Sequence, residues 1–336
     1  MATAGPWTWE PAGEHGEILR TTGRTAAALR RLTETLPSVV TTTDPDLRVV
    51  ALHLLARGSK RLRPALVFLA AEHGSFDESL LQPVATALEL IHVASLYHDD
   101  VMDRATLRRG GPSANAAWGN QAATIAGTYL LARANALLVV AGPGLVAATA
   151  TAAVELCTGQ LQEVEYAYDL DLTEEQHFAV VARKTATLFE LPCRLGAHLG
   201  ELPPPLVTAL ATYGHHLGIA FQLADDALDL SGRQSHLGRS ITNDLREGTY
   251  SLAVLHALAH PEHGEQLRGV LQSLRLHPTE VRTAIQLVRA SGGIQRALDT
   301  ARAHAEQART ALHPLPPGPA RTTLARLADY AVTRSG

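Results

Sequence analysis

Six aspartates in two short segments are the residues of this chain whose types and spacing best suit chemistry. The segments 99–103 and 225–229 both read Asp-Asp-x-x-Asp, and the six acids are Asp99, Asp100, Asp103, Asp225, Asp226 and Asp229. On a helix the first and last aspartate of each segment stand one turn apart on the same face, where like charges repel. Apolar runs precede both segments, so we expect the carboxylates to face the mouth of an apolar cavity and to need a cation.

The type of ligand indicates which cation that would be. Carboxylate oxygens, with no cysteine and no histidine pair at ligand spacing beside them, favour a hard divalent ion. Mg²⁺ typically keeps several waters and bridges carboxylates to a substrate phosphate. The alternative for one such segment is the solvated, acidic end of a helix, but its repetition after a second apolar helix favours a metal site.

Three groups of basic residues complement these acids. They lie at 60–63, 108–109 and 184–185, where Lys184 is followed by Thr185. Arginine offers a rigid fork to phosphate oxygens, lysine a point charge and threonine a hydroxyl donor. Each group alone would be read as solvated surface. Together with the acids and an apolar cavity, they predict a site that binds a metal-diphosphate head group and buries a hydrocarbon tail.

Composition and periodicity predict the elements that position these residues. Of the 336 residues 46% are hydrophobic and only 4% aromatic, and β-branched runs are scarce, so we expect an all-α fold. Helical periodicity begins near residue 16, with brief breaks at 74–75, 109–112, 142–144, 201–205, 291–293 and 313–319. We expect about ten helices in a single domain, 21–336, after a loosely ordered tail, 1–20.

Charge and targeting signals exclude several classes of protein. A net charge of −4 gives no electrostatic footprint for nucleic acid or an anionic membrane. The uncharged stretch 136–154 is interrupted at 142–144, which predicts two buried helices joined by a turn and no transmembrane segment. Cys157 and Cys193 are expected to be free, buried thiols of a reducing compartment, and no secretory signal is recognisable, so we expect a cytoplasmic protein.

These motifs, together with 58–64, 118–120, 244–248 and 327–330, resemble those of trans-polyprenyl diphosphate synthases of the isoprenoid synthase family. The resemblance implies a bundle of long antiparallel helices around a deep central cavity, assembled as a homodimer. It implies a reaction in which Mg²⁺ and basic groups stabilise the diphosphate leaving group of an allylic substrate. The alkene of isopentenyl diphosphate then attacks the allylic cation, and the product is longer by one five-carbon unit.

The same resemblance assigns roles to individual positions. Contacts with the diphosphate of isopentenyl diphosphate fall to Lys60, Arg63, His92 and Arg109. Contacts with the allylic diphosphate fall to Arg108, Lys184, Thr185 and Gln222. The metal ligands are Asp99, Asp103 and Asp225, with Asp100, Asp226 and Asp229 as further candidates, and Asp99, Asp103, Lys184 and Asp225 are expected to be catalytic. The polar segment 231–248 is expected to form a lid.

Two positions depart from the family pattern. Thr249 stands where many relatives carry a lysine, and Thr128 stands where an aspartate commonly follows glycine. The missing lysine removes one diphosphate contact. The expected result is either a lower rate or an unchanged rate if Arg239 or Arg246 in the same loop substitutes for the lysine, and loss of activity is not expected.

Product length is predicted from Ala94 and Ser95, which lie just ahead of the first aspartate segment. In short-chain relatives a large aromatic residue near this position forms a floor, so two small residues predict medium or long all-trans products. A short-chain (C15–C20) product is the alternative, in which another residue makes the floor.

Two other kinds of function remain open. A class I terpene cyclase has the same fold but no site for a second diphosphate, so Lys60, Arg63 and Arg109 argue against it. A non-catalytic partner subunit would be expected to lose aspartates from one segment, and both segments are complete.

Overall fold

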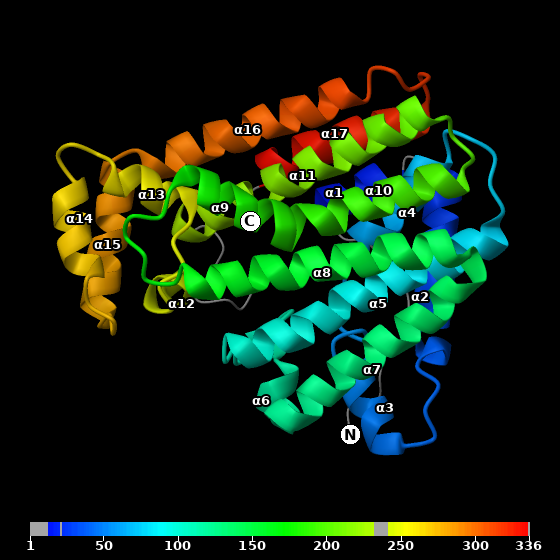
Figure 1. Ribbon diagram of the computed structural model, residues 1–336, viewed down its shortest axis with the longest axis horizontal. Coiled ribbons are helices and arrows are strands. Elements are labelled where there is room, and N and C mark those ends of the chain that lie inside the picture. Colours follow the sequence, from blue (N-terminus) through cyan, green and yellow to red (C-terminus); the bar gives the residue numbers. More distant parts are fainter. Residues whose placement is uncertain (1–12, 21, 232–240, 335–336) are drawn as a thin grey trace. The chain divides into compact units, whose positions relative to one another are not determined.

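The computed structural model describes residues 13–20, 22–231 and 241–334. Within these ranges every regular secondary-structure element is a helix apart from one two-stranded hairpin, which confirms the predicted all-α fold (Figure 1). The segments expected as breaks all separate helices in the structure. The central cavity implied by the family resemblance stays a prediction.

The chain divides into two compact units. Unit 1 comprises Met1–Ala150, Leu191–Ala211 and Leu312–Leu327, and unit 2 comprises Thr151–Glu190, Thr212–Ala311 and Ala328–Gly336. The division falls inside four helices, α8 (Pro143–Glu165), α10 (Thr187–Leu199), α11 (Pro204–Ser231) and α17 (Pro319–Thr333). A single domain over 21–336 stays a prediction.

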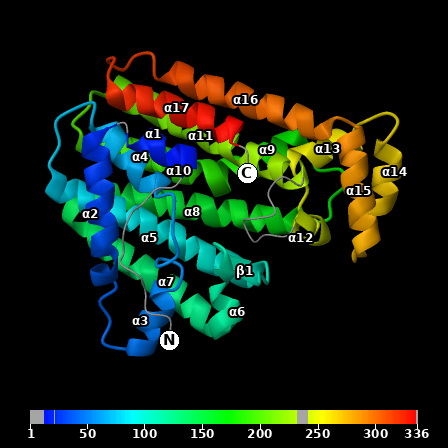
Figure 2. The ribbon, with the colours of Figure 1, turned by 180° about the vertical axis from the view of Figure 1, so that it is seen from behind.

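Unit 1 is built on the pair formed by α5 and α7, which lie side by side (Figure 1). The elements that lie wholly in this unit are α1 (Gly13–Leu19), α2 (Gly23–Val39), α3 (Pro45–Leu52), α4 (Leu62–Ala71), α5 (Glu78–Met102), α6 (Ala114–Trp118), α7 (Asn120–Leu138) and the 3-10 turn η1 (Val139–Ala141). Figure 2 shows α2 beside α4 and α5, with which it packs. Helix α1 lies within the expected tail, and its Ile18 and Leu19 are buried, so this part of the tail is helical and packed.

Helix α5 carries the first aspartate segment at its C-terminal end. Its N-terminus is capped by the Asp77 side chain, which accepts a hydrogen bond from Ser79 N at 2.8 Å. Its other end packs closely on α7, where a Cβ at Gly127 would lie 2.6 Å from His98 Nε2. The apolar sequence of α5 therefore reflects a core helix, and the end that carries the acids is held against α7.

Two helices are long and apolar enough to cross a membrane by length and composition alone. These are Glu78–Met102, with 61% of its apolar window buried, and Asn120–Ala141, with 33% buried. The first value is typical of a core helix of a soluble protein. The predicted turn near Gly142 is confirmed, but the predicted burial of its flanks is wrong, because Val139, Val140 and Val154 are exposed. These three valines would be buried only if a surface outside this chain packed against them.

A small β-hairpin follows α5 in place of the simple break that the sequence predicted. Strands β1 (Leu107–Arg108) and β2 (Gly111–Pro112) pair antiparallel, and the two turn residues, Arg109 and Gly110, have φ of 51° and 72°. Positive φ at both turn positions is the requirement of a type I′ turn. The hairpin thus presents Arg108 and Arg109 within a defined backbone.

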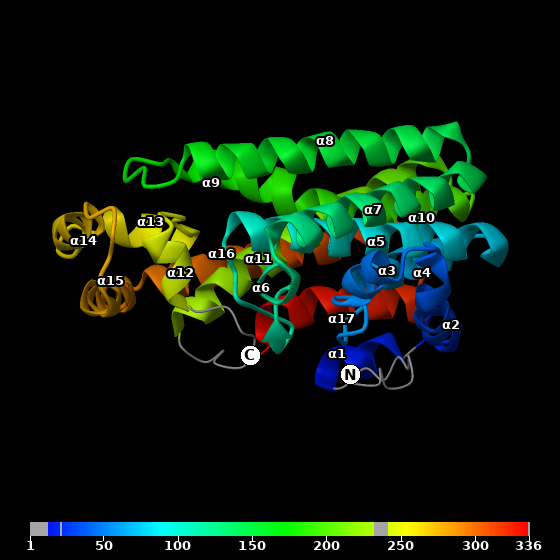
Figure 3. The same cartoon turned by 90° about the horizontal axis from the view of Figure 1, so that it is seen from below.

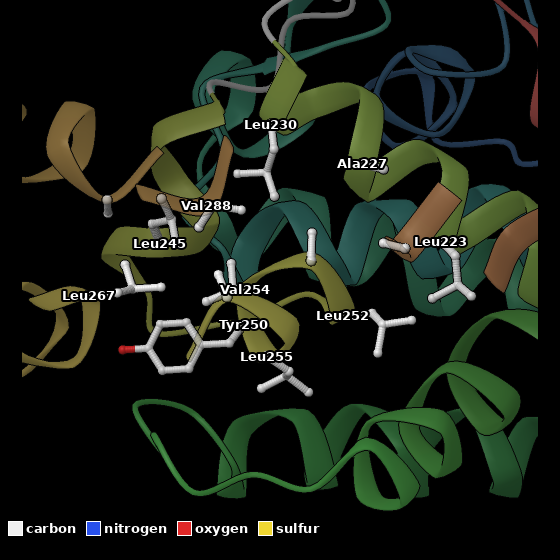
Figure 4. Close-up of a cluster of buried hydrophobic side chains, with 14 of the residues drawn as sticks. Leu223, Ala227, Leu230, Leu245, Tyr250, Leu252, Val254, Leu255, Leu267 and Val288 are labelled. Atoms are coloured by element: carbon white, nitrogen blue, oxygen red, sulfur yellow. The ribbon is translucent and has the colours of Figure 1, made fainter. Parts of the chain in front are cut away.

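Unit 2 gathers the shorter helices of the C-terminal half. The elements that lie wholly in it are α9 (Glu174–Val181), the π-helical turn η2 (Ala182–Ala186), α12 (Ile241–Arg246), α13 (Leu252–Leu258), α14 (Gly264–Leu271), α15 (Pro278–Ala290) and α16 (Gly293–Ala311). Helices α14 and α15 pack side by side (Figure 3). Figure 4 shows the core of this unit, in which Leu230, Leu245 and Val288 converge from α11, α12 and α15. This core supports the end of α11, which carries the second aspartate segment.

Two further expectations need correction. Of the segment predicted to be a lid, 232–240 lies outside the described residues, as does Arg239, and Ile241–Arg246 forms a helix instead of a loop. Of the two cysteines, which are free as predicted, Cys193 is buried but Cys157 is exposed. An apolar neighbourhood in the sequence did not distinguish a core helix from an uncovered helix face.

Candidate active site

The first aspartate segment closes α5 in unit 1. Asp103 is the C-cap residue, and its backbone N–H donates to Asp99 O at 2.8 Å, so the two side chains stand one turn apart as predicted. Both side chains are partly exposed. Asp99 and Asp103 therefore keep the placement expected of metal ligands.

Asp100 has a different position from the one predicted for it. Its side chain is fully buried, and Arg108 holds it, with Nε 2.7 Å and Nη2 2.5 Å from Oδ1. This pair ties the hairpin to the end of α5, which favours a structural role for both residues, while the metal role of Asp100 and the diphosphate role of Arg108 stay predictions. A helix position fixes which way a side chain points, and Asp100 points inward.

A basic cluster lies in unit 1 around the buried carboxylate of Glu89. Arg61 Nη1 lies 2.5 Å from Glu89 Oε1, and Ser59 Oγ donates to the same oxygen at 3.0 Å. Burial alone would raise the pKa of Glu89, but Arg61 and Arg109, with the two hydrogen bonds, hold it below the ordinary value. Glu89 therefore stays charged and anchors the loop that carries Lys60.

Three of the four residues predicted to bind isopentenyl diphosphate, Arg63, His92 and Arg109, come together in this cluster. Burial, opposed by Glu89 and reinforced by Arg109, lowers the pKa of Arg63 to about 10, which leaves its charge intact at neutral pH. Arg109 Nη1 donates to Leu54 O at 2.9 Å. Burial, and then the charges of Arg63 and Arg109, hold the pKa of His92 well below its usual range. His92 is thus a neutral ring among guanidinium groups, an environment that suits an anion.

The second aspartate segment lies near the end of α11 in unit 2, in a polar network. Thr185 Oγ1 donates to Gln222 Oε1 at 3.0 Å, and Gln222 Nε2 donates to Asp226 Oδ1 at 2.7 Å. The structure therefore joins two residues predicted to contact the allylic diphosphate with one of the acids.

Negative charge accumulates at this segment. Burial first, and then the carboxylates of Asp244 and Asp225, hold the pKa of Asp226 well above its ordinary value, with a smaller effect from Asp229. Asp244, on α12, was not predicted as part of this acid cluster. Its only signal in the sequence was its place in the family motif 244–248.

Lys184 lies on the π-helical turn η2, and the structure gives it an acidic partner. Its Nζ forms an ion pair with Glu163 of α8. A Cβ at Gly159 would lie 2.8 Å from Lys184 N, so α8 packs closely against this turn. Single π-helical turns are frequent at functional sites. Glu163 was not singled out in the sequence, because nothing local distinguishes it from a solvated helix residue.

A second basic partner reaches the acids from the end of the chain. Arg334 Nη2 lies 3.1 Å from Asp225 Oδ1 and donates to Phe221 O at 2.9 Å. Residues so far apart along the chain give no signal of pairing in a single sequence. Asp225 therefore has a cationic partner within its own unit.

The acid cluster fits a hard divalent cation. Its donors are carboxylate oxygens alone, and their mutual repulsion, seen in the raised pKa of Asp226, is relieved by a bound cation. Among the residues that the structure describes, no three His, Cys, Asp or Glu side chains form a preformed metal cage. A cation here would complete its coordination with water and substrate oxygens, as Mg²⁺ usually does.

The remaining predicted positions lie on or near these elements. Ala94 is fully buried in α5, and Ser95 is partly buried, with Oγ donating to His92 O at 2.9 Å. Thr249 N donates to Asp244 O at 2.8 Å, while Thr128 lies exposed on α7. The chain-length role of Ala94 and Ser95 stays a prediction.

Comparison with known proteins gives one consistent result. A family model described as polyprenyl synthetase matches residues 44–288. The chain is 39% identical over 314 residues to the nonaprenyl diphosphate synthase of Mycobacterium tuberculosis, which covers 92% of this chain and 93% of that protein. It is 36% identical over 305 residues to the heptaprenyl diphosphate synthase component 2 of Geobacillus stearothermophilus, which covers 90% of this chain and 94% of that protein.

A solved structure extends this likeness to three dimensions. The crystal structure of a polyprenyl synthase from Caulobacter crescentus, complexed with calcium and isoprenyl diphosphate, matches with a TM-score of 0.90 and 32% identity. The match covers 97% of this chain and 100% of that chain.

Proposed function

Because the chain belongs to the polyprenyl synthetase family, we propose that it is a prenyltransferase that elongates an allylic diphosphate with isopentenyl diphosphate. One observation carries this proposal. Each unit holds an aspartate segment near the end of a long helix together with side chains that suit a diphosphate, Arg63 and Arg109 in unit 1 and Lys184 and Thr185 in unit 2. Two such sets are what a reaction between two diphosphates requires.

The reaction breaks the bond between the allylic carbon and its diphosphate, and the alkene of isopentenyl diphosphate attacks the allylic cation. Loss of a proton then gives a longer allylic diphosphate. No nucleophilic side chain is needed. Lys184 stabilises the departing diphosphate by charge, and Thr185 and Gln222 orient it by hydrogen bonds. Lys60, Arg63 and Arg109 hold the second substrate.

We propose Mg²⁺ as the cation of both aspartate segments, with Asp99 and Asp103 as ligands in unit 1 and Asp225 and Asp229 in unit 2. The oxygen-only donors and the raised pKa of Asp226 support a hard cation. Calcium together with isoprenyl diphosphate in the Caulobacter crescentus structure supports a divalent ion. When bound, Mg²⁺ neutralises charge on the diphosphate.

We propose medium or long all-trans products. The relatives from Mycobacterium tuberculosis and Geobacillus stearothermophilus are nonaprenyl and heptaprenyl diphosphate synthases by name, and Ala94 and Ser95 add no large side chain to α5. Ala94→Tyr, or Ser95→Phe if the first variant does not fold, is expected to shorten the product seen by chromatography, whereas Ala94→Ser is not. A wild type that stops at C20 would contradict this proposal in favour of a short-chain synthase.

We propose that the protein is a homodimer. Exposed apolar side chains support this assembly, with Val139 and Val140 in unit 1 and Val154, Leu161 and Val164 in unit 2. The last three recur at helical spacing on α8 and so share one face. Leu161→Arg is expected to give monomers in analytical ultracentrifugation, while an unchanged mass would exclude this face as the contact.

For the exposed apolar side chains that follow α7, Val139 and Val140, a second copy of the chain is a more suitable partner than a lipid bilayer. Arg133 lies within α7, where its Nε donates to Val39 O at 3.0 Å, so this helix carries a charge that is tied to its own unit. The two free thiols support our further proposal that the protein is cytoplasmic.

One assay separates the functions under consideration. The protein is incubated with radiolabelled isopentenyl diphosphate, an allylic primer and Mg²⁺, with EDTA in a parallel reaction. Labelled polyprenyl diphosphates that require Mg²⁺ are expected. Release of unlabelled cyclic hydrocarbon from the primer would indicate a terpene cyclase, and no product with any primer would indicate a non-catalytic subunit.

A further inference from the structure

Arg334 is buried at the point where the chain leaves α17, and its guanidinium has three partners in unit 2. It forms the ion pair with Asp225 at 3.1 Å, it donates to Phe221 O at 2.9 Å, and its Cζ lies 3.8 Å from the centre of the Phe221 ring. Its side chain is 5% exposed, whereas that of Asp225 is 39% exposed. The arginine is therefore fixed in place, and the carboxylate remains open to solvent on its other side.

The environment of Arg334 differs from that of an ordinary surface pair in the same unit. Arg309 and Asp329 lie 3.2 Å apart, but their side chains are 48% and 52% exposed. An exposed pair of this kind contributes little, because water and salt screen it. Arg334 differs in both respects. Its guanidinium stacks on Phe221, and its buried stem keeps water and salt away from its side of the ion pair.

The carboxylate that Arg334 contacts belongs to the acid cluster of unit 2. Asp225 and Asp244 both raise the pKa of Asp226, so negative charge is concentrated there. A buried, fixed guanidinium beside these carboxylates offsets part of their negative charge, as a bound cation would. Two cations compete for one carboxylate when both are close to it.

We propose that Arg334 is the internal counter-ion of Asp225, which neutralises this carboxylate in the metal-free protein and is displaced from it when a divalent cation binds. This inference rests on the proposed metal role of the second aspartate segment. Arg334 is a positioning residue here, because it acts through Asp225. Its contact links the end of α17 to the occupancy of the acid cluster.

Two consequences follow from this competition. Removing the guanidinium should lower the stability of the metal-free protein, because Asp225 then loses its ion pair with Arg334 while the carboxylates around Asp226 remain. Removing it should also strengthen cation binding, because the cation no longer has a competitor. A residue that merely packs against Phe221 would produce the first effect without the second.

The first measurement needs no metal. Urea unfolding in EDTA is compared for the wild type, Arg334→Gln, Asp225→Asn and the double variant. The double variant should lose less stability than the sum of the two single losses, and the difference should correspond to a factor of about five or more in the unfolding equilibrium constant. Coupling close to zero would overturn the proposal.

The second measurement is the dissociation constant of Mn²⁺, followed by electron paramagnetic resonance in the presence of inorganic diphosphate. Arg334→Gln is expected to bind Mn²⁺ about fivefold more tightly than the wild type. The matched control Arg309→Gln, which opens an Arg–Asp pair of nearly the same length, should leave the constant unchanged. If Arg334→Gln does not fold, Arg334→Lys, which keeps the charge but loses the stacked fork, should show a smaller shift in the same direction.

The outcomes separate this inference from the proposed function. If Asp225→Asn leaves Mn²⁺ affinity unchanged, the metal role of the segment is wrong, and the inference falls with it. If Asp225→Asn weakens Mn²⁺ binding but neither Arg334 variant strengthens it, only the competition between Arg334 and the cation is overturned.

Discussion

Arg61 and Glu89 form a buried ion pair in unit 1, with Nη1 and Oε1 2.5 Å apart and side chains that are 3% and 1% exposed. Arg61 adopts a left-handed backbone conformation, φ 50°, at the N-terminal boundary of α4. The pair fixes the loop between the flanking predicted diphosphate residues, Lys60 and Arg63. A buried carboxylate thus organises a site for an anion, because it holds the cations around it.

Breaking this pair should destabilise the protein strongly. Arg61→Gln leaves the Glu89 carboxylate buried without its main partner, and we expect a loss of about 3 to 5 kcal/mol in the free energy of unfolding, measured with urea. The control Arg31→Gln opens the exposed pair of Arg31 with Glu78, 2.7 Å long, and should cost less than about 1 kcal/mol. Equal losses would show that burial does not determine the strength of the first pair.

Asp100 should behave as a structural residue although it lies within the first aspartate segment. Asp100→Asn removes the charge that holds Arg108, so we expect about 2 to 4 kcal/mol lower stability. Asp299→Asn, which affects the exposed pair with Arg302, is the control and should have little effect. A stable Asp100→Asn variant that has lost affinity for divalent cations would instead restore Asp100 as a metal ligand.

Replacing Lys60 and replacing Lys184 should change the kinetic constants for different substrates. Lys60→Ala is expected to raise the apparent KM for isopentenyl diphosphate, and Lys184→Ala is expected to impair use of the allylic diphosphate. Arg183→Ala, next to Lys184 but paired with Glu155 at the surface, serves as control and should change neither constant. Equal effects of Lys60→Ala and Lys184→Ala on both substrates would contradict the assignment of one site to each unit.

Stability should fall as the pH falls toward 4, in part through His304. Burial, followed by the nearby His216 and His215, lowers the pKa of His304 from 6.5 to about 4. Between these values the unfolded chain binds a proton that the folded protein does not, so the folded state loses stability as pH falls from 6.5 to 4. The loss is of the order of 1 kcal/mol, given solvent screening at this partly exposed cluster.

Replacing His304 should flatten this pH dependence. Urea unfolding of His304→Gln at several pH values is expected to show less loss across the window, whereas His313→Gln, a change at an exposed histidine, should keep the wild-type slope. An unaltered slope in His304→Gln would mean that other groups cause the loss.

Patterns local in sequence predicted the helices and the two aspartate segments, since apolar periodicity and acids four residues apart depend only on helix geometry. The inward direction of Asp100 was missed because its partner, Arg108, lies on a hairpin that the sequence did not indicate. Arg334 was missed as a partner of the second segment because it lies more than a hundred residues away along the chain, and Asp244 was missed because it lies on a separate helix, α12. Val139 and Val140 looked buried, because an apolar residue covered by the core and one left uncovered have the same side chain.

The central claim is that both aspartate segments, one in each unit, serve a single elongation reaction. The most direct test measures incorporation of radiolabelled isopentenyl diphosphate by Asp99→Asn and by Asp225→Asn beside the wild type, with circular dichroism to verify folding. Each variant is expected to stay folded and to lose at least about a hundredfold in rate. A folded variant of either aspartate that elongates the primer at the wild-type rate would contradict the claim.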